Sequence, residues 1–496
     1  MKRFIGLGNQ YHDASVAVFN EDGELVFFSQ TERLSRIKRD ANIPNLNTLF
    51  TGVGMRPLSK DDVIYTSSPD FFFRDISCLS NSEPSSINFK QLQDMFMGYD
   101  VRFIGHHIAH AMCSFMFRDT RLDEACIYIS LDGFGKSSRN TNSCFSTGSI
   151  AENVFEEVSS DMSFDYSPHY RLNPLPMPYT NSGEVAGKIM GLAGSIPEEK
   201  TRYLSISEVN NSILRFKAEG LSEGVAIEYA SHYNSFIKDA KSVVLPLLDP
   251  HSNSKSVIVG GGAFLALELN TFIREHGFEL VFAPPINDSG ISLGCAAAAY
   301  FQTYGVFPSP ILTPFLQSIE AEHQNNYQTP QQAANILVDL NTPIGLIIGK
   351  GEAGPRALGH RSLLAVPTIN NKTLVSETIK GREAYRPVAP IVTDRDFSNL
   401  FNGPAGRYMQ YRNVCKEAAV RLTPGIVHDD SSSRVQVLSY VDNPWLYETL
   451  VEVGKKTGAE CLINTSLNGR GKPIVNSVND VHREMETKYF RLISFN

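Results

Sequence analysis

The sequence lacks the paired cysteines and the long apolar runs that mark several large classes of protein. Its 7 cysteines are odd in number and form no Cys-x-x-Cys pair, which argues against a disulfide framework or a cysteine zinc site and favours a reducing compartment. No apolar run approaches the ~20 residues that span a bilayer. Residues Met1–Asp13 turn polar after a few apolar positions, so no signal peptide is predicted. These absences predict a cytoplasmic protein without a membrane partner.

An excess of positive charge is also missing. The net charge is −8, so no global basic field is available to hold nucleic acid, and none is expected as a partner. The 496 residues exceed the ~250–300 at which one core usually stops growing, so two or three domains are expected. Prolines and polar residues fill Gly305–Thr329, and we place a boundary there, between domains at 1–325 and 326–496. A homodimer is the base-rate expectation.

Two segments of the first half have the pattern of a β-meander. Each opens with a strand that stops at a glycine or an Asp-Gly turn. The predicted strands are Phe4–Gly8, Ser15–Phe19 and Leu25–Ser29 in the first, and Cys126–Leu131 and Asn142–Gly148 in the second. The repetition predicts an α/β class with an internally duplicated domain, as in actin-like ATPases, where ligands bind at the carboxyl ends of the strands.

Other segments are typical of helices or of buried strands. The predicted helices are Gly187–Ala193, Gly220–Leu247, Cys295–Tyr300 and one that begins near Asn335. The predicted strands are Ser256–Val259, Leu280–Pro284 and Ile344–Ile348. The pattern therefore restarts, with a helix and a strand, after the proposed boundary.

A histidine pair is the first candidate site. His106 and His110 follow a predicted strand and turn and are four positions apart, so they share a helical face and can hold one metal ion. Carboxylates end predicted strands at Asp132 and Asp288. Two imidazoles with one or two carboxylates suit a divalent iron, zinc or manganese ion. Taken singly, Asp132-Gly133 and Asp288-Ser289-Gly290 are better explained as plain turns, but together they favour a metal site.

Further candidates in the first half are catalytic or nucleotide-binding. His12-Asp13 follows the first predicted strand, either as a proton-transfer pair beside a phosphate or acceptor hydroxyl, or as a surface turn. His107 points away from the face of the histidine pair and is interpreted as supporting the site or contacting substrate. Gly261 and Gly262 follow a strand, where backbone without Cβ can approach a ribose or phosphate. Glycine-rich strand exits are also common in α/β folds, and the sequence has no Gly-x-x-x-x-Gly-Lys-Ser/Thr motif.

The second half gathers arginines among small and apolar residues, beginning in Gly354–Ser362. The candidate anion ligands are Arg356, Lys380, Arg386, Arg434, Asn464 and Ser466. Arginine forks bind phosphate oxygens, lysine adds a point charge, and amides and hydroxyls complete the cage. A charge run is usually a solvated face, but these charges lie among Gly, Pro, Ala and Leu. The surroundings favour a site for phosphate-bearing ligands.

Several long motifs occur in one order along nearly the whole chain. They are HDAS at 12–15, HHIAHA at 106–111, LDGFG at 131–135, GKIMGLA at 187–193, FAPPINDSGISLG at 282–294, GPRALGHRS at 354–362, KGREAYRPVAP at 380–390, SRVQ at 433–436 and NTSLNG at 464–469. With these motifs the chain resembles the nodulation-protein-U-like O-carbamoyltransferases of antibiotic and natural-product biosynthesis. Motifs of this length in one order make the resemblance specific.

The resemblance implies a first domain like the universal tRNA threonylcarbamoyl transferase, with an actin-like fold and a metal. The implied ligands, of Fe²⁺, are His106, His110, Asp132 and Asp288, and the implied nucleotide contacts in this domain are Gly261, Gly262 and Lys188. The second domain is implied to be YrdC-like and to form carbamoyl-adenylate from carbamoyl phosphate and ATP with Mg²⁺, on the anion ligands named above. The carbamoyl group would then pass to a hydroxyl of a small acceptor, with the metal polarising its carbonyl and His12 or Asp13 helping to deprotonate the acceptor.

Departures from the family pattern bear on this expectation. Lys136 stands where an acidic residue is usual, Ala266 where asparagine is common, and Lys472 where glutamate is common. Beyond Val475 the ending follows the pattern poorly, and its final strand is hard to find. These changes leave open a catalytically impaired nucleotide-binding or regulatory homologue and, against the acidic balance, a tRNA threonylcarbamoyl transferase.

Overall fold

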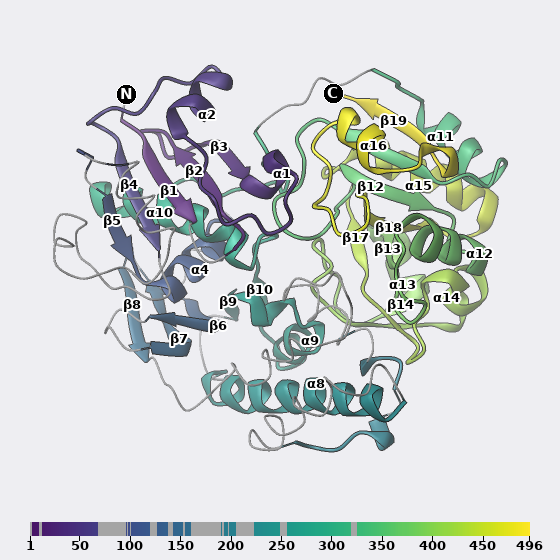
Figure 1. Ribbon diagram of the computed structural model, residues 1–496. Coiled ribbons are helices and arrows are strands. Elements are labelled where there is room, and N and C mark those ends of the chain that lie inside the picture. The colour runs from purple at the N-terminus through teal and green to yellow at the C-terminus, as the bar shows by residue number, and fades with distance from the viewer. Residues whose placement is uncertain are drawn as a thin grey trace.

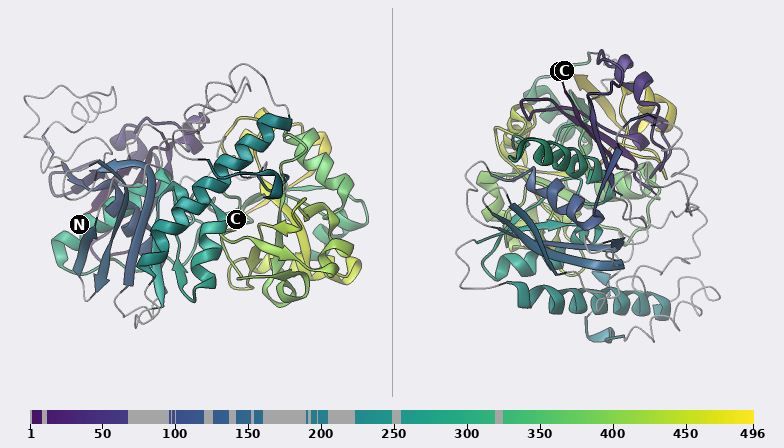
Figure 2. Two further views of the ribbon diagram at one scale, coloured as in Figure 1. Left: turned by 90° about the horizontal axis from the view of Figure 1, so that it is seen from below. Right: turned by 90° about the vertical axis from the view of Figure 1, so that its left-hand side faces the viewer.

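The architecture comes from a computed structural model (Figure 1). It describes residues 2–8, 12–67, 96, 98–99, 101–119, 126–136, 142–151, 154–159, 190, 193–196, 198–204, 223–248, 255–318 and 325–496. Figures 1 and 2 show the first half of the chain, in purple to teal, beside the second half, in green to yellow. Two five-stranded sheets belong to the first half, and a six-stranded and a three-stranded sheet to the second.

The first sheet has the strand order β3-β2-β1-β4-β5. Its strands are β1 (Phe4–Gly8), β2 (Ser15–Phe19), β3 (Leu25–Gln30), β4 (Val63–Ser67) and β5 (Val101–Ile104). β1, β2 and β3 pair antiparallel, and β4 and β5 add to β1 in parallel. The predicted first meander is confirmed, whereas the strand at β4 was not predicted.

The second sheet repeats this order as β10-β9-β6-β7-β8. Its strands are β6 (Cys126–Lys136), β7 (Asn142–Ala151), β8 (Val154–Ser159), β9 (Ser256–Gly260) and β10 (Glu279–Val281). β6, β7 and β8 pair antiparallel, and β9 and β10 follow β6 in parallel. Because each strand has a counterpart of the same position and direction in the first sheet, the structure confirms the predicted duplicated, actin-like α/β class.

Several strand boundaries in this sheet differ from those predicted, and one difference has a clear physical reason. The strand predicted at Leu280–Pro284 corresponds to β10, which ends at Val281. Pro284 and Pro285 follow, and a proline has no backbone N–H to donate to a neighbouring strand. The ladder therefore ends before them, and the chain leaves the sheet in a loop that leads to Asp288.

Two helices pack between the two sheets and against each other. α10 (Ile291–Tyr304) covers β1, β2 and β4, while α4 (His106–Phe115) covers β6 and β9. Their contact is close because α10 presents glycine and alanine: a Cβ added at Gly294 would lie 1.9 Å from the carbonyl oxygen of Ala109. The predicted helix at Cys295–Tyr300 is therefore the centre of a longer one. Both helices begin at the same end of the two sheets, where the carboxyl ends of β1 and β6 also lie.

Gly294→Ala is expected to lower the free energy of unfolding by about 3 kcal/mol, the upper end of the usual cost of overpacking, because α10 must move away from α4. Urea unfolding of the purified variant measures the loss. Gly52→Ala is a matched control, because a Cβ at Gly52 would meet nothing within 4 Å, and its effect should stay within about 0.5 kcal/mol. Equal losses in the two variants would contradict the close packing of α10 on α4.

The remaining helices of the first half include α1 (Thr31–Ser35), α2 (Leu46–Gly52), α8 (Glu223–Val244) and α9 (Leu267–Glu275). The helix predicted at 220–247 corresponds to α8, whose end passes into a 3₁₀ turn at Leu245–Leu247 that contains Pro246. The helix predicted at 187–193 lies largely outside the described residues. In Figure 1, α1 lies on the side of the first half that faces the second half.

The second half is built on a six-stranded sheet of order β17-β13-β18-β12-β11-β19. Its strands are β11 (Ile344–Ile348), β12 (Arg361–Ala365), β13 (Ala389–Thr393), β17 (Gln436–Leu438), β18 (Cys461–Ser466) and β19 (Arg491–Phe495). The small sheet consists of β14 (Phe401–Asn402), β15 (Asn413–Cys415) and β16 (Ser432–Ser433). The helices are α11 (Pro330–Val338), α12 (Ile369–Thr373), α13 (Asp394–Leu400), α14 (Glu417–Leu422), α15 (Pro444–Thr457) and α16 (Val478–Glu484). The strand prediction at Ile344–Ile348 is confirmed, and the YrdC-like assignment and the domain boundary stay predictions.

Two expectations for this half were wrong. The first helix begins at Pro330 and not near Asn335, because Thr329 and Gln332 form a capping box that starts it earlier. The final strand that was hard to find in the sequence is present as β19, which pairs in parallel with the whole of β11. Its sequence, RLISF, alternates weakly, and its position is fixed by its buried neighbour β11.

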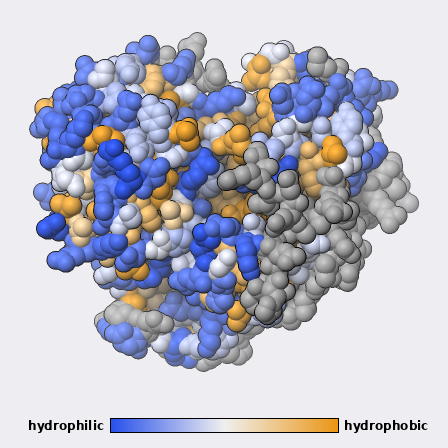
Figure 3. Space-filling view, turned by 180° about the vertical axis from the view of Figure 1, so that it is seen from behind, coloured by the Kyte–Doolittle hydropathy of each residue, from blue (hydrophilic) through white to orange (hydrophobic). Residues whose placement is uncertain are grey.

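The molecular surface carries mixed side chains. On the face in Figure 3, hydrophilic residues predominate and hydrophobic ones are scattered among them. Within the described ranges, no helix combines the length and the apolar composition needed to cross a membrane.

Candidate metal centre and anion site

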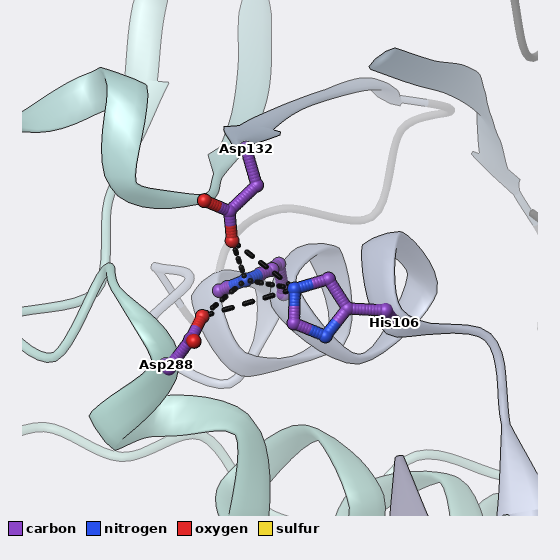
Figure 4. Close-up of side chains that lie close together, drawn as sticks. His106, Asp132 and Asp288 are labelled. Carbon is purple, nitrogen blue, oxygen red and sulfur yellow. Dashed lines mark hydrogen bonds and ion pairs between the residues drawn. The ribbon is translucent and has the colours of Figure 1, made fainter. Parts of the chain in front are cut away.

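Four side chains converge where the two sheets and their helices meet. His106 and His110 lie one turn apart on α4, Asp132 follows Leu131 in β6, and Asp288 lies in the 3₁₀ turn that precedes α10. Figure 4 shows Asp132, Asp288 and His106 pointing toward one another. One ligand atom from each of the four residues lies within 4.8 Å of the others.

The distances between these atoms fit a shared cation. His106 Nε2 lies 3.1 Å from Asp132 Oδ2 and 3.2 Å from His110 Nε2. His110 Nε2 lies 2.7 Å from Asp132 Oδ2 and 3.2 Å from Asp288 Oδ1. An ion bonded at about 2.0–2.2 Å to nitrogen and oxygen ligands keeps them about 3.0–3.5 Å apart. Two imidazole nitrogens and two carboxylate oxygens are also a donor set that divalent transition metals accept.

The charges around the cluster favour a positive ion between the carboxylates. Burial lowers the pKa of His110, but hydrogen bonds to Asp132 and Asp288 outweigh this and raise the pKa to about 9. Burial likewise raises the pKa of Asp132, but hydrogen bonds from His106 and His110 hold it well below its usual value. The cluster thus favours a negative Asp132 beside a positive centre, the charge pattern that a divalent cation matches.

His12 and Asp13 lie at the open side of this cluster. His12 Nδ1 is 2.9 Å from Asp13 Oδ2 and 3.5 Å from Asp288 Oδ2, and the His12 side chain is 36% exposed. Asp13 is buried, and its Oδ2 also accepts from Arg39 Nε and Asn287 Nδ2, each at 3.4 Å. Since Asp13 is buried and bonded to several groups, the pair is not a surface turn.

Arg39 and Asn287 were not predicted as site residues. Asn287 is the neighbour of Asp288 in the FAPPINDSG motif, so its signal was present in the sequence but not used. Arg39 belongs to none of the motifs that carried the prediction. Asp13 has a φ of +59°, and its backbone N–H donates to the Arg39 carbonyl at 3.3 Å. A left-handed backbone at a non-glycine residue requires such fixed surroundings.

His107 is not brought to the cluster. It is buried, and its Nδ1 faces Ser130 Oγ on β6 at 3.3 Å. The predicted interpretation as a group that supports the site fits this geometry, because His107 holds α4 against the strand that carries Asp132. A direct contact with substrate does not fit a side chain that is enclosed between α4 and β6.

The glycines predicted to approach a nucleotide have a packing role in the structure. Gly261 has a φ of +97°, and a Cβ there would lie 2.1 Å from the carbonyl oxygen of Leu131. The residue therefore lets β9 end directly against the strand end that carries Asp132. Gly262 begins a 3₁₀ turn, Gly262–Leu265. Lys188 lies outside the described residues, and nucleotide contacts of these three residues stay a prediction.

A group of arginines forms the second candidate site, in the other half of the chain. Burial lowers the pKa of Arg356 to about 10, with a further contribution from Arg386. Burial lowers the pKa of Arg434 well below its usual value, and Arg356, Arg382 and Arg386 add to the effect. The buried Nε of Arg434 has no hydrogen-bond partner within the described part of the chain. Like charges collected in this way create a strong local demand for an anion.

The other three predicted anion ligands form hydrogen bonds with one another, with Asn468 or with the loop that carries Arg356. Lys380 is buried, and its Nζ donates to the backbone oxygens of Ser466 at 2.6 Å and Asn468 at 3.0 Å. Asn464 Nδ2 donates to the Ala357 carbonyl at 3.1 Å, and Ser466 Oγ donates to Asn468 Oδ1 at 2.6 Å. In this structure these groups fix the end of β18 and the residues that follow it against the loop that carries Arg356.

Arg361, the second arginine of the GPRALGHRS motif, points elsewhere. It is buried, and it donates to the carbonyl oxygens of Ile348 at 2.8 Å, Gly349 at 2.8 Å and Asn476 at 3.1 Å. A guanidinium whose donors are taken by backbone carbonyls holds strands together. The motif therefore divides its arginines between Arg356 in the cluster and Arg361 in the core.

The two departures from the family pattern whose side chains are described lie at a helix start and in a loop. Ala266 is the N-cap of α9 and makes no side-chain capping bond. Lys472 is exposed, and its backbone N–H donates to the Gly469 carbonyl at 3.2 Å. The side chain of Lys136 is not among those the structure describes.

Comparison with known proteins matches both ends of the chain to one class of enzyme. The model of the carbamoyltransferase C-terminus matches residues 334–496, and that of the carbamoyltransferase N-terminus matches residues 3–77. The C-terminal match runs through β19, so the expectation of an aberrant ending beyond Val475 was wrong. The chain is thus a carbamoyltransferase by its family models.

Curated relatives cover most of the chain. Nodulation protein U of Rhizobium tropici is 25% identical over 545 residues, with 93% of this chain and 90% of that protein covered. Nodulation protein NolNO of Sinorhizobium fredii is 26% identical over 535 residues, with 96% and 77% covered. Among solved structures, full-length HypF in its phosphate- and nucleotide-bound form is similar to 61% of this chain and 56% of its own, with 13% identity and a TM-score of 0.38. The chain belongs to the nodulation-protein-U-like carbamoyltransferase family.

Proposed function

We propose that the protein is an ATP-dependent O-carbamoyltransferase with two sites, a carbamoyl-adenylate-forming site in residues 326–496 and a transfer site in residues 1–325. The observation that carries the proposal is the pairing of a four-ligand metal cluster in one half with an arginine cluster in the other. In a carbamoyltransferase, the arginines suit the phosphates of carbamoyl phosphate and Mg²⁺-ATP, and the metal cluster suits a carbonyl that must be activated.

In the first half-reaction, hydrolysis of carbamoyl phosphate yields carbamate and phosphate. A carbamate oxygen then attacks the α-phosphorus of ATP, the bond to the β-phosphate breaks, and pyrophosphate leaves. Arg356, Arg386 and Arg434 would hold the phosphate oxygens and offset the charge that collects on them. Lys380, Asn464 and Ser466 would support the wall of the site and turn toward the ligand where their present contacts allow.

In the second half-reaction, the oxygen of an acceptor hydroxyl attacks the carbamoyl carbon, and the bond to AMP breaks. His106, His110, Asp132 and Asp288 would hold a divalent ion, for which Fe²⁺ is our candidate, and a bound ion would act as a Lewis acid on the carbamoyl carbonyl. Because Nδ1 of His12 faces Asp13, Nε2 is the ring nitrogen left to accept the hydroxyl proton. Asp13 then orients His12 and is not itself the base.

The acceptor is proposed to be a small hydroxylated natural product. The His12 side chain, at the open side of the cluster, is 36% exposed, whereas His106 and His110 are almost fully enclosed. An acceptor would therefore approach on the side of His12. Shielding of the adenylate from water would protect it from hydrolysis before the acceptor arrives.

Pyrophosphate release tests the proposal. Purified protein with Mg²⁺-ATP should release pyrophosphate only when carbamoyl phosphate is added, and a reaction without carbamoyl phosphate is the control. Release that depends on carbamoyl phosphate would justify a screen of hydroxylated acceptors. ATP binding without any release would favour the catalytically impaired homologue. Tight binding of tRNA with a steep dependence on salt would favour the tRNA-modifying alternative.

A further inference from the structure

Residues of the first half of the chain form hydrogen bonds with the loop that carries Arg356. Both backbone polar groups of Gly354 are bonded across the boundary: its N–H donates to Gln30 Oε1 at 2.9 Å, and its carbonyl accepts from Arg33 Nη2 at 2.7 Å. Gln30 ends β3, and Arg33 lies in α1. Gln30, Arg33 and Gly354 are all buried, so water does not compete for these bonds.

The same glycine packs against the segment that leads to the metal cluster. Gly354 has a φ of +93°, and a Cβ there would lie 2.4 Å from the carbonyl oxygen of Pro284 and 2.9 Å from the Cα of Pro285. Asn287 and Asp288 follow these prolines within a few positions. Gly354 is therefore fixed by hydrogen bonds on one side and by backbone contact on the other, two positions before Arg356.

A buried carboxylate shapes the rest of the loop. Glu352 is buried, and its Oε1 accepts from the backbone N–H groups of Leu358 at 2.8 Å, His360 at 2.9 Å and Arg361 at 3.0 Å. The loop is thus closed around Glu352 on its own side and held by Gln30 and Arg33 on the other. Arg356 lies between these two fixed points.

A second contact keeps α1 in place. Arg36 follows α1 with a φ of +59°, and its guanidinium donates to both carboxylate oxygens of Glu484, at 2.9 and 2.8 Å. It also donates to the carbonyl oxygens of Ile474 at 2.7 Å and Pro473 at 2.9 Å. Because Arg36 anchors one end of α1 in the second half, Arg33 cannot shift without straining this second anchor.

From these contacts we propose that Gln30 and Arg33 are positioning residues for adenylate formation, although they belong to the metal-bearing half. They hold Gly354 and so aim Arg356 at the phosphate of the ligand. The inference rests on the proposed function, because it assigns these residues to the half-reaction at the arginine cluster. It implies that residues 326–496 alone would not hold Arg356 in position to bind the anion.

The test compares variants that remove or retain the two bonds. Arg33→Met and Gln30→Leu are expected to raise the KM for carbamoyl phosphate in pyrophosphate release about tenfold, with kcat changed less than about threefold, since each loses one buried hydrogen bond that orients the loop. Arg33→Lys retains a donor for the Gly354 carbonyl and should recover most of the affinity. The dissociation constant of inorganic pyrophosphate, measured by calorimetry, should weaken about tenfold in the same two variants.

Arg3→Met is the matched control. Arg3 is also a buried arginine of the first half, but its partners are Asp62 and the carbonyls of Arg56 and Pro57. Its loss should lower stability and leave the KM and the pyrophosphate affinity unchanged. If Arg33→Met does not fold, Gln30→Leu decides.

Two failures are distinguishable. A wild-type protein that binds pyrophosphate yet never forms it from ATP contradicts the proposed function. In that case the calorimetric comparison still tests whether Gln30 and Arg33 position the Arg356 loop. An active wild type, with KM and pyrophosphate affinity unchanged in both Arg33→Met and Gln30→Leu, overturns the positioning role alone.

Discussion

Replacing His110 with alanine is expected to abolish carbamoyl transfer to the acceptor while pyrophosphate release continues at nearly the wild-type rate. His110 Nε2 contacts Asp132 at 2.7 Å, Asp288 at 3.2 Å and His106 at 3.2 Å, so it is central to the cluster. Its loss removes one of four ligands and leaves two carboxylates facing each other. Loss of a side chain that only supports a metal ligand lowers metal affinity or activity about 10–100-fold. Removal of a ligand itself should therefore lower the rate of transfer about 100-fold or more.

Two measurements on the same preparations check this expectation. Product formation with a suitable acceptor reports transfer, and pyrophosphate release reports adenylate formation. Elemental analysis of the wild type should find a divalent transition metal, which His110→Ala should lack. Treatment of the wild type with a strong chelator, followed by removal of the chelator and addition of Mg²⁺, should reproduce the selective loss of transfer.

His276→Ala is the matched control, because His276 is an exposed histidine at the end of α9. Within the described part of the chain, its ring forms a hydrogen bond only with its own helix, at the Phe272 carbonyl. The variant should keep both activities and the metal. Arg386→Ala should stop pyrophosphate release, and with it transfer, while the metal is retained. If His110→Ala and Arg386→Ala lose pyrophosphate release equally, the division into two sites is wrong.

Replacing Arg434 with methionine should remove activity and yet stabilise the protein in the absence of anions. Burial and the positive charges of Arg356, Arg382 and Arg386 all lower the pKa of Arg434. The charged form of Arg434 is therefore disfavoured in the folded protein. Methionine has a similar length, no charge and no buried donor to satisfy. We expect a rise of ~1–4 °C in the melting temperature and a fall of ~100-fold in pyrophosphate release.

Added anion separates this explanation from ordinary changes in packing. Inorganic pyrophosphate should raise the melting temperature of the wild type, because it binds only the folded arginine cluster, and should hardly affect Arg434→Met. Arg412→Met provides the comparison, since Arg412 is paired with Asp430 at 2.9 Å and its removal should bring neither stabilisation nor loss of activity. A lower melting temperature for Arg434→Met, with no effect of pyrophosphate on the wild type, would contradict an anion site here.

The fold could be predicted from the sequence where local pattern and final position agree. The meander strands β1 to β3 are short apolar runs between turn residues, and β11 is continuous and buried on both faces, so hydrophobic pattern alone located them. β4 and β19 were missed because each is defined as a strand by pairing in parallel with a strand from a distant part of the chain, β4 with β1 and β19 with β11. Helix α11 was misplaced because its start is set by a cap and not by the apolar stripe.

The candidate sites could be predicted to a similar extent, for a similar reason. His106 and His110 carry a local signal in their spacing, and Asp132 and Asp288 carry one in their place at strand ends, so the sequence sufficed to group them before any geometry was known. Residue type and sequence position alone could not show that Arg356 and Arg361 have different roles. Only the fold determines which guanidinium donates to backbone carbonyls. The hydrogen bonds of Gln30 and Arg33 with Gly354 join residues more than 300 positions apart, so no local sequence pattern predicts them.

The bond from Arg36 to Glu484 also has a consequence for the order of events during synthesis. The two residues are 448 positions apart. At ~5–20 residues per second, Arg36 leaves the ribosome about 20–90 s before its partner exists. Arg33 in α1 lacks its partner until Gly354 has been made, and Arg36 lacks its partner until Glu484 has been made, so the first half must emerge with this segment still exposed to water. Premature termination near the end of the message would therefore leave a chain that has its metal ligands, its arginines and Gly354, but in which Arg36 has no carboxylate partner to anchor the end of α1.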